Sequence, residues 1–157
     1  MLIRVLWVLL AANCWGQVLG TWKIIPAKSR ASSGPFAEAI TVKYEAHTKE
    51  THRRAEIWTF YHVRGEGISE TTSQTLRFDG KEYPCGDLGF EDRPDTVISR
   101  KLDARTAEVS YKKSGRVTRR VVRTVSADGK QMTLEVHITP EKGPVERWLV
   151  FERDEDR

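Results

Sequence analysis

Apolar and polar residues alternate with a period of two along short runs of this chain. In residues 39–46, Ile40, Val42 and Tyr44 fall on one side, and the residues between them are polar. The same alternation runs through residues 107–113 and 131–138. A period of two is that of a β-strand with one dry face and one wet face. No long run carries the period of an amphipathic helix, so the pattern predicts an all-β chain.

Turn-forming residues separate the candidate strands at short intervals, in "FDGKEY", "KSGR", "SADGK" and "PEKGP". The candidate strands cover residues 21–25, 39–46, 54–63, 73–78, 95–102, 107–113, 116–125, 131–138 and 145–153. Tight turns between neighbours make an antiparallel meander, and closure of such a meander removes its exposed edges. We expect a small antiparallel up-and-down β-barrel of about 8–10 strands, which is either filled by side chains or holds one small ligand.

The N-terminus has a different character. Residues 1–16 combine one basic residue, Arg4, with the apolar run "VLWVLLAA" and a stretch of small and polar residues. This layout predicts a signal peptide over 1–16, cleaved after Gly16, and a barrel domain over 17–157 that is exported to the periplasm or beyond. Two other interpretations stay open, although the apolar run is short for a membrane span and the residues before Cys14 match a lipidation signal poorly. They are an N-terminal membrane anchor and lipidation at Cys14.

Charge and cysteine content narrow the function classes. The formal net charge of the 157-residue chain is +4. A mild, dispersed excess of this kind favours solubility and does not indicate a nucleic-acid partner. Cys85 is the only cysteine after residue 16, so the predicted mature chain has no internal disulfide. A domain of this size can form a sufficient core without one.

Several sequence blocks resemble a known superfamily. They are "LGTWKIIPAKSRASSGP", "FDGKEYP", "DTVISRKLD", "SADGKQMTLEV" and the closing "VFER". Together they resemble the calycins, which include lipocalins and fatty-acid-binding proteins. The similarity is closer to bacterial secreted lipocalin-like proteins of unknown role, and it covers nearly all of residues 19–153.

The resemblance implies a structural pair and one departure. In calycins an early tryptophan at the closed end of the barrel lies beneath an arginine of the last strand, which implies the pair Trp22 and Arg153. A guanidinium over an indole ring gains a cation–π contact. Fatty-acid-binding proteins carry two lid helices after their first strand, whereas residues 26–39 are too short and lack a helical period. An open or differently capped mouth is therefore implied.

Aromatic residues provide the candidate ligand site. Tyr44, Trp58, Phe60 and Phe78 suit a largely apolar pocket with few polar anchors. His62 follows two of these aromatics at a two-residue spacing. It is a candidate for binding haem iron or a ligand carboxylate, although a hydrogen-bonded histidine in the barrel wall is the favoured interpretation.

Arginines concentrate in residues 116–125, where Arg119 and Arg123 interleave with valines at a two-residue spacing. If this face points inward, one arginine can pair with an anionic ligand head group. If it points outward, the arginines are solubilising charges that discourage edge pairing. The outward orientation is favoured, because an unpaired buried charge is expensive. Arg147 poses the same choice on a last strand that is apolar on both sides, so its orientation stays open.

The sequence shows no catalytic set, metal-ligand spacing or phosphate loop, so we expect no enzyme, no metal and no cofactor. The first hypothesis is an exported barrel that binds a small apolar or amphipathic molecule in its interior, without stable membrane insertion. The alternative is a filled barrel that works through its surface and has no ligand. Haem binding through His62 is a third interpretation that depends on that one side chain.

Overall fold

The computed structural model describes residues 18–33, 39–47, 55–64, 68–90, 92–139 and 143–155, with the backbone alone for residues 47, 55–64 and 68–70. The predicted signal peptide, and Cys14 with it, lies outside these residues. The strands are β1 Gly20–Ile24, β2 Arg30–Ala31, β3 Ala39–His47, β4 Ala55–Arg64, β5 Ile68–Leu76, β6 Asp79–Pro84, β7 Thr96–Lys101, β8 Thr106–Lys113, β9 Arg116–Val125, β10 Gln131–Ile138 and β11 Val145–Asp154. One 3-10 turn, η1, spans Pro26–Lys28. The predicted all-β class is confirmed.

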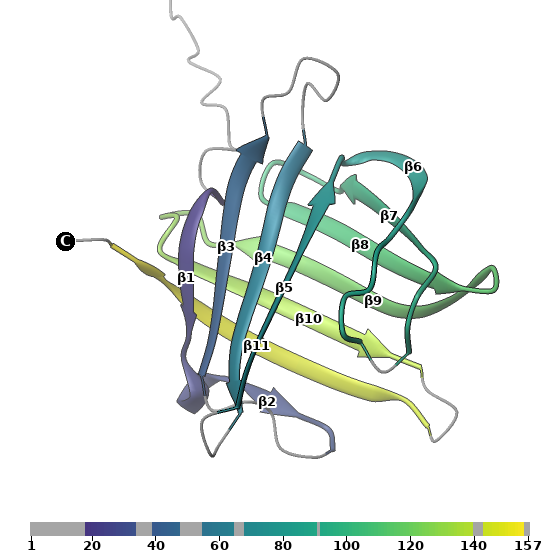
Figure 1. Ribbon diagram of the computed structural model, residues 1–157. Coiled ribbons are helices and arrows are strands. Elements are labelled where there is room, and N and C mark those ends of the chain that lie inside the picture. The colour runs from purple at the N-terminus through teal and green to yellow at the C-terminus, as the bar shows by residue number, and fades with distance from the viewer. Residues whose placement is uncertain are drawn as a thin grey trace, which may run out of the picture.

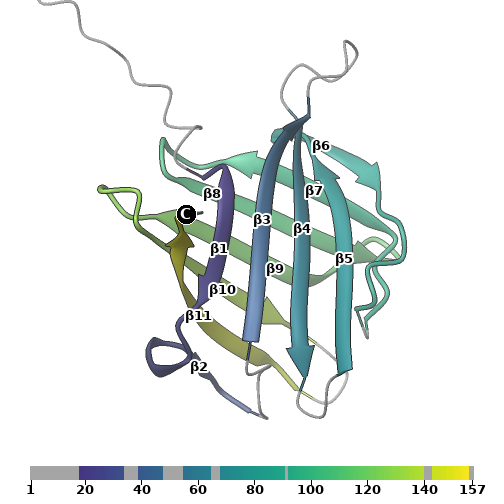
Figure 2. The same cartoon turned by 60° about the vertical axis from the view of Figure 1, so that its left-hand side comes forward.

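The strands form one antiparallel sheet in the order β5-β4-β3-β1-β11-β10-β9-β8-β7-β6, with β2 paired beside β11. The first strand therefore pairs with the last, and β5 and β6 lie at the two ends of the ladder. Figures 1 and 2 show that the sheet bends over on itself, so that β1, β3, β4 and β5 form one wall and β7 to β11 form the other. The predicted up-and-down meander is confirmed.

The two ends of the barrel differ. The β7–β8 and β9–β10 turns lie at the end that contains Trp22, which we call the closed end. The β6–β7, β8–β9 and β10–β11 connections lie at the opposite end, which we call the mouth. This assignment follows from the antiparallel order of the strands.

Two strands were not expected from the pattern, the two-residue β2 and the longer β6. The segment that begins "DGKEYP" reads as a turn, yet it forms β6, and β5 ends at Leu76 instead of Phe78. Nearly all of β6 is exposed, so it carries no alternation to detect. A register shift separates Asp79 and Glu82, and the Asp79 carboxylate accepts hydrogen bonds from the Lys81 amide (3.0 Å) and the Tyr83 hydroxyl (2.6 Å).

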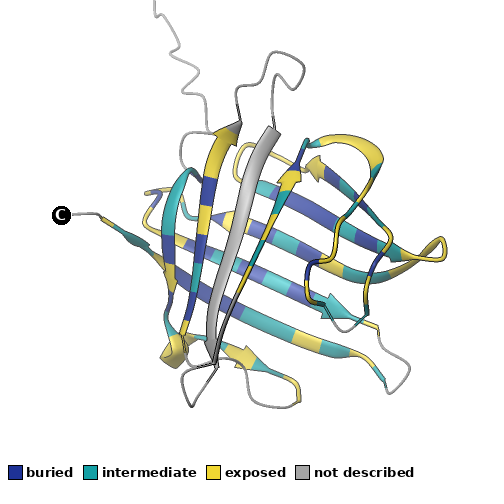
Figure 3. Cartoon of the chain, viewed as in Figure 1, coloured by how far each residue is buried: buried dark blue, intermediate teal, exposed yellow. Residues whose placement is uncertain are grey.

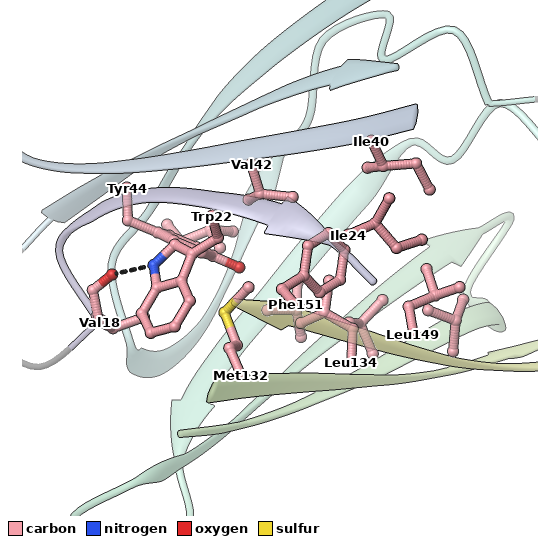
Figure 4. Packing of buried hydrophobic residues seen from close by; sticks show 14 of the residues in the cluster. Val18, Trp22, Ile24, Ile40, Val42, Tyr44, Met132, Leu134, Leu149 and Phe151 are labelled. Atoms are coloured by element: carbon pink, nitrogen blue, oxygen red, sulfur yellow. Dashed lines mark hydrogen bonds between the residues drawn. The ribbon is translucent and has the colours of Figure 1, made fainter. Parts of the chain in front are cut away.

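The core lies between the two walls. Buried residues appear at every second position on β3 and β10, and on β8 with Glu108 buried in addition, as the dark stripes in Figure 3 show. Figure 4 shows Trp22 and Tyr44 facing Met132, Leu134 and Phe151 from the opposite wall. Among the largest side chains of this cluster, Trp22, Tyr111, Met132 and Phe151 are fully buried. The alternation thus places the predicted dry faces toward a shared interior.

Candidate ligand site inside the barrel

The closed end is built around Trp22. Its side chain is 0% exposed, and its indole N–H donates to the carbonyl of Val18 at 2.8 Å. Arg153 is the cross-strand neighbour of Trp22, and its guanidinium carbon lies 4.3 Å from the centre of the ring. The same guanidinium donates to the Leu19 carbonyl at 2.7 Å and to the Gly129 carbonyl at 3.0 Å. The structure therefore brings together the two residues that the resemblance implied.

Gly20 makes room for this arrangement. A β-carbon on Gly20 would lie 3.0 Å from Nη1 of Arg153, and its φ of +121° is in the region that favours glycine. The opening Gly-Thr-Trp of β1 thus combines a close approach for the arginine with the ring that the arginine covers.

Three arginines lie on the inner face of the second wall. Residues directly opposite each other in an antiparallel pair share a face. Arg123 is opposite Leu134 and Ala107, which are both buried. By the same rule Arg119 shares a face with buried Tyr111, and Arg147 with buried Val136.

The expectation that this face of β9 points outward is wrong for Arg123, which is 7% exposed. Its guanidinium carbon lies 4.7 Å from the centre of the Tyr44 ring and 5.2 Å from that of Phe78. Cation–π contacts offset part of the cost of burying the charge. Residue spacing along one strand does not reveal such contacts, because Tyr44 comes from the other wall.

The two aromatic contacts of Arg123 come from different elements. Tyr44 is 3% exposed on β3. Phe78 lies in the turn between β5 and β6, has a φ of 52°, and donates its amide to the hydroxyl of Ser99 at 2.9 Å. The structure therefore brings three of the predicted ligand-site residues together in the interior.

The remaining candidates lie on β4. Trp58 pairs with Tyr44, Phe60 with Val42 and His62 with Ile40 in the strand register. Their side chains lie outside the described part of the structure, so the aromatic pocket and the haem interpretation stay predictions for these positions.

Sequence reasoning did not single out a polar pair near the mouth. The Gln74 amide N–H of β5 donates to the hydroxyl of Tyr111 on β8, joining the two walls. Burial raises the pKa of Tyr111 far above its usual range, so the phenol stays protonated. Oε1 of Gln74 and Nε of Arg119 are buried without a hydrogen-bond partner among the described residues. The only signal for this pair in the sequence is the position of Tyr111 in the alternation of residues 107–113, which places its side chain on the apolar face.

On the outer face of the same wall, Glu108 forms ion pairs with two arginines. Glu108 is 5% exposed and accepts from Arg100 Nε at 2.9 Å and also from Arg120. Burial alone would raise the pKa of Glu108, but the hydrogen bonds from Arg120 and Arg100 outweigh it and lower the pKa. Arg120 therefore faces outward, as expected for the residue that directly follows the inward-facing Arg119 in a strand.

Other candidate chemistry is not brought together in the described ranges. No group of three or more His, Cys, Asp or Glu residues that could hold a metal ion occurs there. The Cys85 thiol donates to the Pro94 carbonyl at 3.2 Å, and burial raises its pKa, which opposes activation of the thiol. Within the same ranges, every helix is too short or too polar to cross a bilayer.

No protein-family model and no curated protein matches the chain. Among solved structures, the chain is similar to the zebrafish ileal bile acid-binding protein complexed with cholic acid. The TM-score is 0.54 at 11% identity, over 88% of this chain and 99% of that one. The fold is calycin-like. The barrel is also similar to lobster apocrustacyanin A1, with a TM-score of 0.43 at 12% identity, over 90% of this chain and 63% of that one. At such identities the likeness concerns the fold of the calycin-like barrel alone.

Proposed function

We propose that this calycin-like barrel is an exported, non-catalytic protein that binds a small amphipathic acid in its interior. One observation carries the proposal: Arg119, Arg123 and Arg147 all lie on the inner face of a largely apolar wall. We also propose that the chain belongs with the bacterial secreted lipocalin-like proteins that its sequence blocks resemble.

The physical reason is the energy of buried charge. Guanidinium groups lose hydration inside a protein, and an anionic group that accepts their hydrogen bonds offsets this loss. The apolar residues around them suit a hydrocarbon or ring system. The zebrafish protein of similar fold is complexed with cholic acid, which supports a ligand of this class.

The first test is native mass spectrometry of the protein purified from its own host, with identification of co-purifying small molecules. Direct binding is then measured with 1-anilinonaphthalene-8-sulfonate as a fluorescent reporter, displaced by dodecanoate or by dodecanol. Dodecanoate should displace the dye from wild-type protein at a lower concentration than dodecanol does. A clean apo mass together with no gain in dye fluorescence would contradict the proposal.

A pair of variants tests the role of the inner charge. Arg119→Met removes the charge but keeps an unbranched apolar side chain, whereas Arg120→Met does the same on the outer face of the same strand. Arg119→Met should weaken dodecanoate binding about tenfold or more, the range for a hydrogen bond to a charged group. The affinity for dodecanol should change little in this variant. Arg120→Met should change the affinity for either ligand little. Equal weakening of both ligands would point to damaged packing instead.

The filled barrel is the second candidate, and one observation favours it. Arg123 contacts Tyr44 and Phe78 from different parts of the barrel, so side chains of the protein itself occupy the interior around Arg123. A cavity of about 10 Å³ at the closed end, lined by Val18, Ala107 and Arg123 among others, has room for one water at most. A protein that binds no dye and no co-purifying ligand would support this candidate.

Export is proposed separately. The indole N–H of Trp22 donates to the carbonyl of Val18, and cleavage after Gly16 would keep this contact. The mass of the protein recovered from the periplasm or culture medium should correspond to a chain that begins at Gln17. An uncleaved N-terminus in the membrane fraction, or a lipid on Cys14, would contradict this processing.

A further inference from the structure

We propose that residues 85–90 and 92–95 form a mouth plug, and that its Asp92 occupies, on Arg119 and Thr118, the binding site for the carboxylate of an acidic ligand. This inference rests on the proposed function and gives that function a head-group site and an entrance. Neither the plug nor this pair of residues follows from the alternation pattern.

The plug crosses the mouth from one wall to the other. At its C-terminal end the Asp95 amide donates to the carbonyl of Lys112 at 2.7 Å, and its carboxylate accepts from the amide of Ser114 at 2.7 Å. These contacts fix it to the β8–β9 hairpin. At its far side, a β-carbon on Gly89 would lie 3.6 Å from the methyl group of Thr72 on β5. Figure 1 shows this connection in front of β8 and β9, beside β5.

The plug inserts apolar groups into the barrel instead of lying on its surface. Leu88 is 5% exposed and belongs to the core cluster. Phe90 meets the ring of Tyr111 edge to face, with 5.4 Å between ring centres. The guanidinium carbon of Arg119 lies 3.9 Å from the centre of the Phe90 ring. The plug thus takes space that an apolar ligand would need at the mouth.

A β-bulge creates the carboxylate site. Tyr111 is opposite Arg119 and Lys112 is opposite Val117, so Thr118 is an extra residue on β9. A bulge of this kind re-aims side chains, and here Thr118 and Arg119 both reach the plug. The Thr118 hydroxyl donates to one oxygen of Asp92 at 2.7 Å, and Nη2 of Arg119 donates to the other at 3.0 Å.

Asp92 uses this site incompletely. Its side chain is 10% exposed, and its carboxylate engages Nη2 of Arg119. Nε of Arg119 stays buried without a hydrogen-bond partner in the described part of the chain. Buried polar atoms without partners are unfavourable. A ligand carboxylate that accepts from Nε and Nη2 together would form the stronger bidentate pair. The ligand therefore has a reason to displace Asp92 and to release the plug.

The experiment compares Asp92→Asn with Asp87→Asn in the full chain. Asp87 belongs to the same plug, is exposed, and accepts from the Gly89 amide at 2.9 Å. Asparagine can preserve that local turn. Dodecanoate and dodecanol affinities are measured by dye displacement. Asp92→Asn should bind dodecanoate about tenfold more tightly, with a much smaller gain for dodecanol, whereas Asp87→Asn should match wild type.

Two further readouts connect the effect to the site. In an Arg119→Met background, Asp92→Asn should no longer strengthen dodecanoate binding, because the group for which the two carboxylates compete is gone. Adding dodecanoate to wild-type protein should speed hydrogen exchange of the plug amides. Circular dichroism and thermal melting check that each variant is folded.

The outcomes separate the two proposals. If wild-type protein binds dodecanoate but Asp92→Asn binds it no more tightly, the competition is wrong and interior binding stands. A gain that persists without Arg119 also overturns the proposed site. If neither wild-type protein nor Asp92→Asn binds dodecanoate or the dye, the proposed function fails, and this inference fails with it.

Discussion

Trp22 holds the closed end through several contacts at once. The ring is fully buried, its N–H is bonded to Val18, and Arg153 covers one face. Substitution by alanine would remove the ring, leave the carbonyl of Val18 unpaired and take the aromatic surface away from Arg153. A loss at this position therefore combines a cavity with lost polar contacts.

Trp22→Ala should lower the free energy of unfolding by about 3–5 kcal/mol, the range for losing a large buried aromatic. Urea unfolding followed by circular dichroism measures this loss. Trp148→Ala is the matched control, because Trp148 lies on the outer face of β11, half-buried beside Arg30. The control should lose much less. Similar losses in both variants would contradict a special role for Trp22.

Glu108 gives a residue-scale prediction for pH. Its pKa is lowered in the folded protein because hydrogen bonds from Arg120 and Arg100 outweigh the effect of burial. A carboxyl with a lowered pKa stabilises the fold fully above its unfolded pKa of about 4.3 and loses this contribution as pH falls through the folded value. Both arginines are half-exposed, so solvent screening reduces the effect.

Glu108→Gln should therefore destabilise the protein by about 1–2 kcal/mol at neutral pH. Its difference from wild type should shrink below about pH 4. Urea unfolding of both proteins across this pH range is the measurement. A difference that is the same at every pH would mean that packing, not charge, is lost.

The β8–β9 hairpin shows how an element aims its residues. Ser114 and Gly115 in its turn have φ values of 48° and 77°, the positive-φ pair that matches the twist of a two-residue hairpin. The bulge at Thr118 follows two residues after this β9 strand begins. Turn and bulge together decide that Arg119 faces the plug while Arg120 faces Glu108.

Gly115→Ala should destabilise the protein by about 1 kcal/mol, because an L-residue pays for the left-handed conformation. Nothing lies within 4 Å of a β-carbon built at Gly115 or at Gly86, and Gly86 has no positive φ of this kind. Gly86→Ala is thus a control for the change of residue type alone and should be neutral or slightly stabilising. Thermal melting of both variants compares them, and equal shifts would rule out the turn as the cause.

Sequence patterns predict elements in this protein where one face is wet and the other dry. The bounds of β9 and β10 match the predicted runs, and those of β3 and β8 differ by one residue. The pattern fails for β6, which is wet on nearly all positions, and for the plug, whose inward residues have no period. Arg123 shows the limit for the site: an arginine at an alternating position fits either face until Tyr44 and Phe78 lie beside it.

At the scale of the whole molecule, the barrel is one hydrogen-bonded sheet with β5 and β6 as its two edge strands. The ladder begins at β5 and finishes at β6, and no pairing joins these two strands among the described residues. The turn at Arg77 and Phe78 connects them at the closed end, while the plug reaches from the second wall to β5 near the mouth. The β3–β4 and β4–β5 pairs are as extensive as the pairs that β9, β10 and β11 form, so what sets β5 and β6 apart is that each has a paired neighbour on one side alone among the described residues.

This arrangement predicts a gradient in hydrogen exchange. Amides of β9 and β10, which have paired neighbours on both sides, should exchange only through global unfolding. Amides of β6 that face away from β7 should exchange much sooner, because local opening breaks few contacts. Exchange followed by NMR on labelled protein gives the rate at each amide. Protection of β5 and β6 equal to that of β9 would show that the two edges are bridged in solution. A barrel with two unbridged edges can instead separate there when the plug moves, which links entry of a ligand to the two edge strands of the ladder.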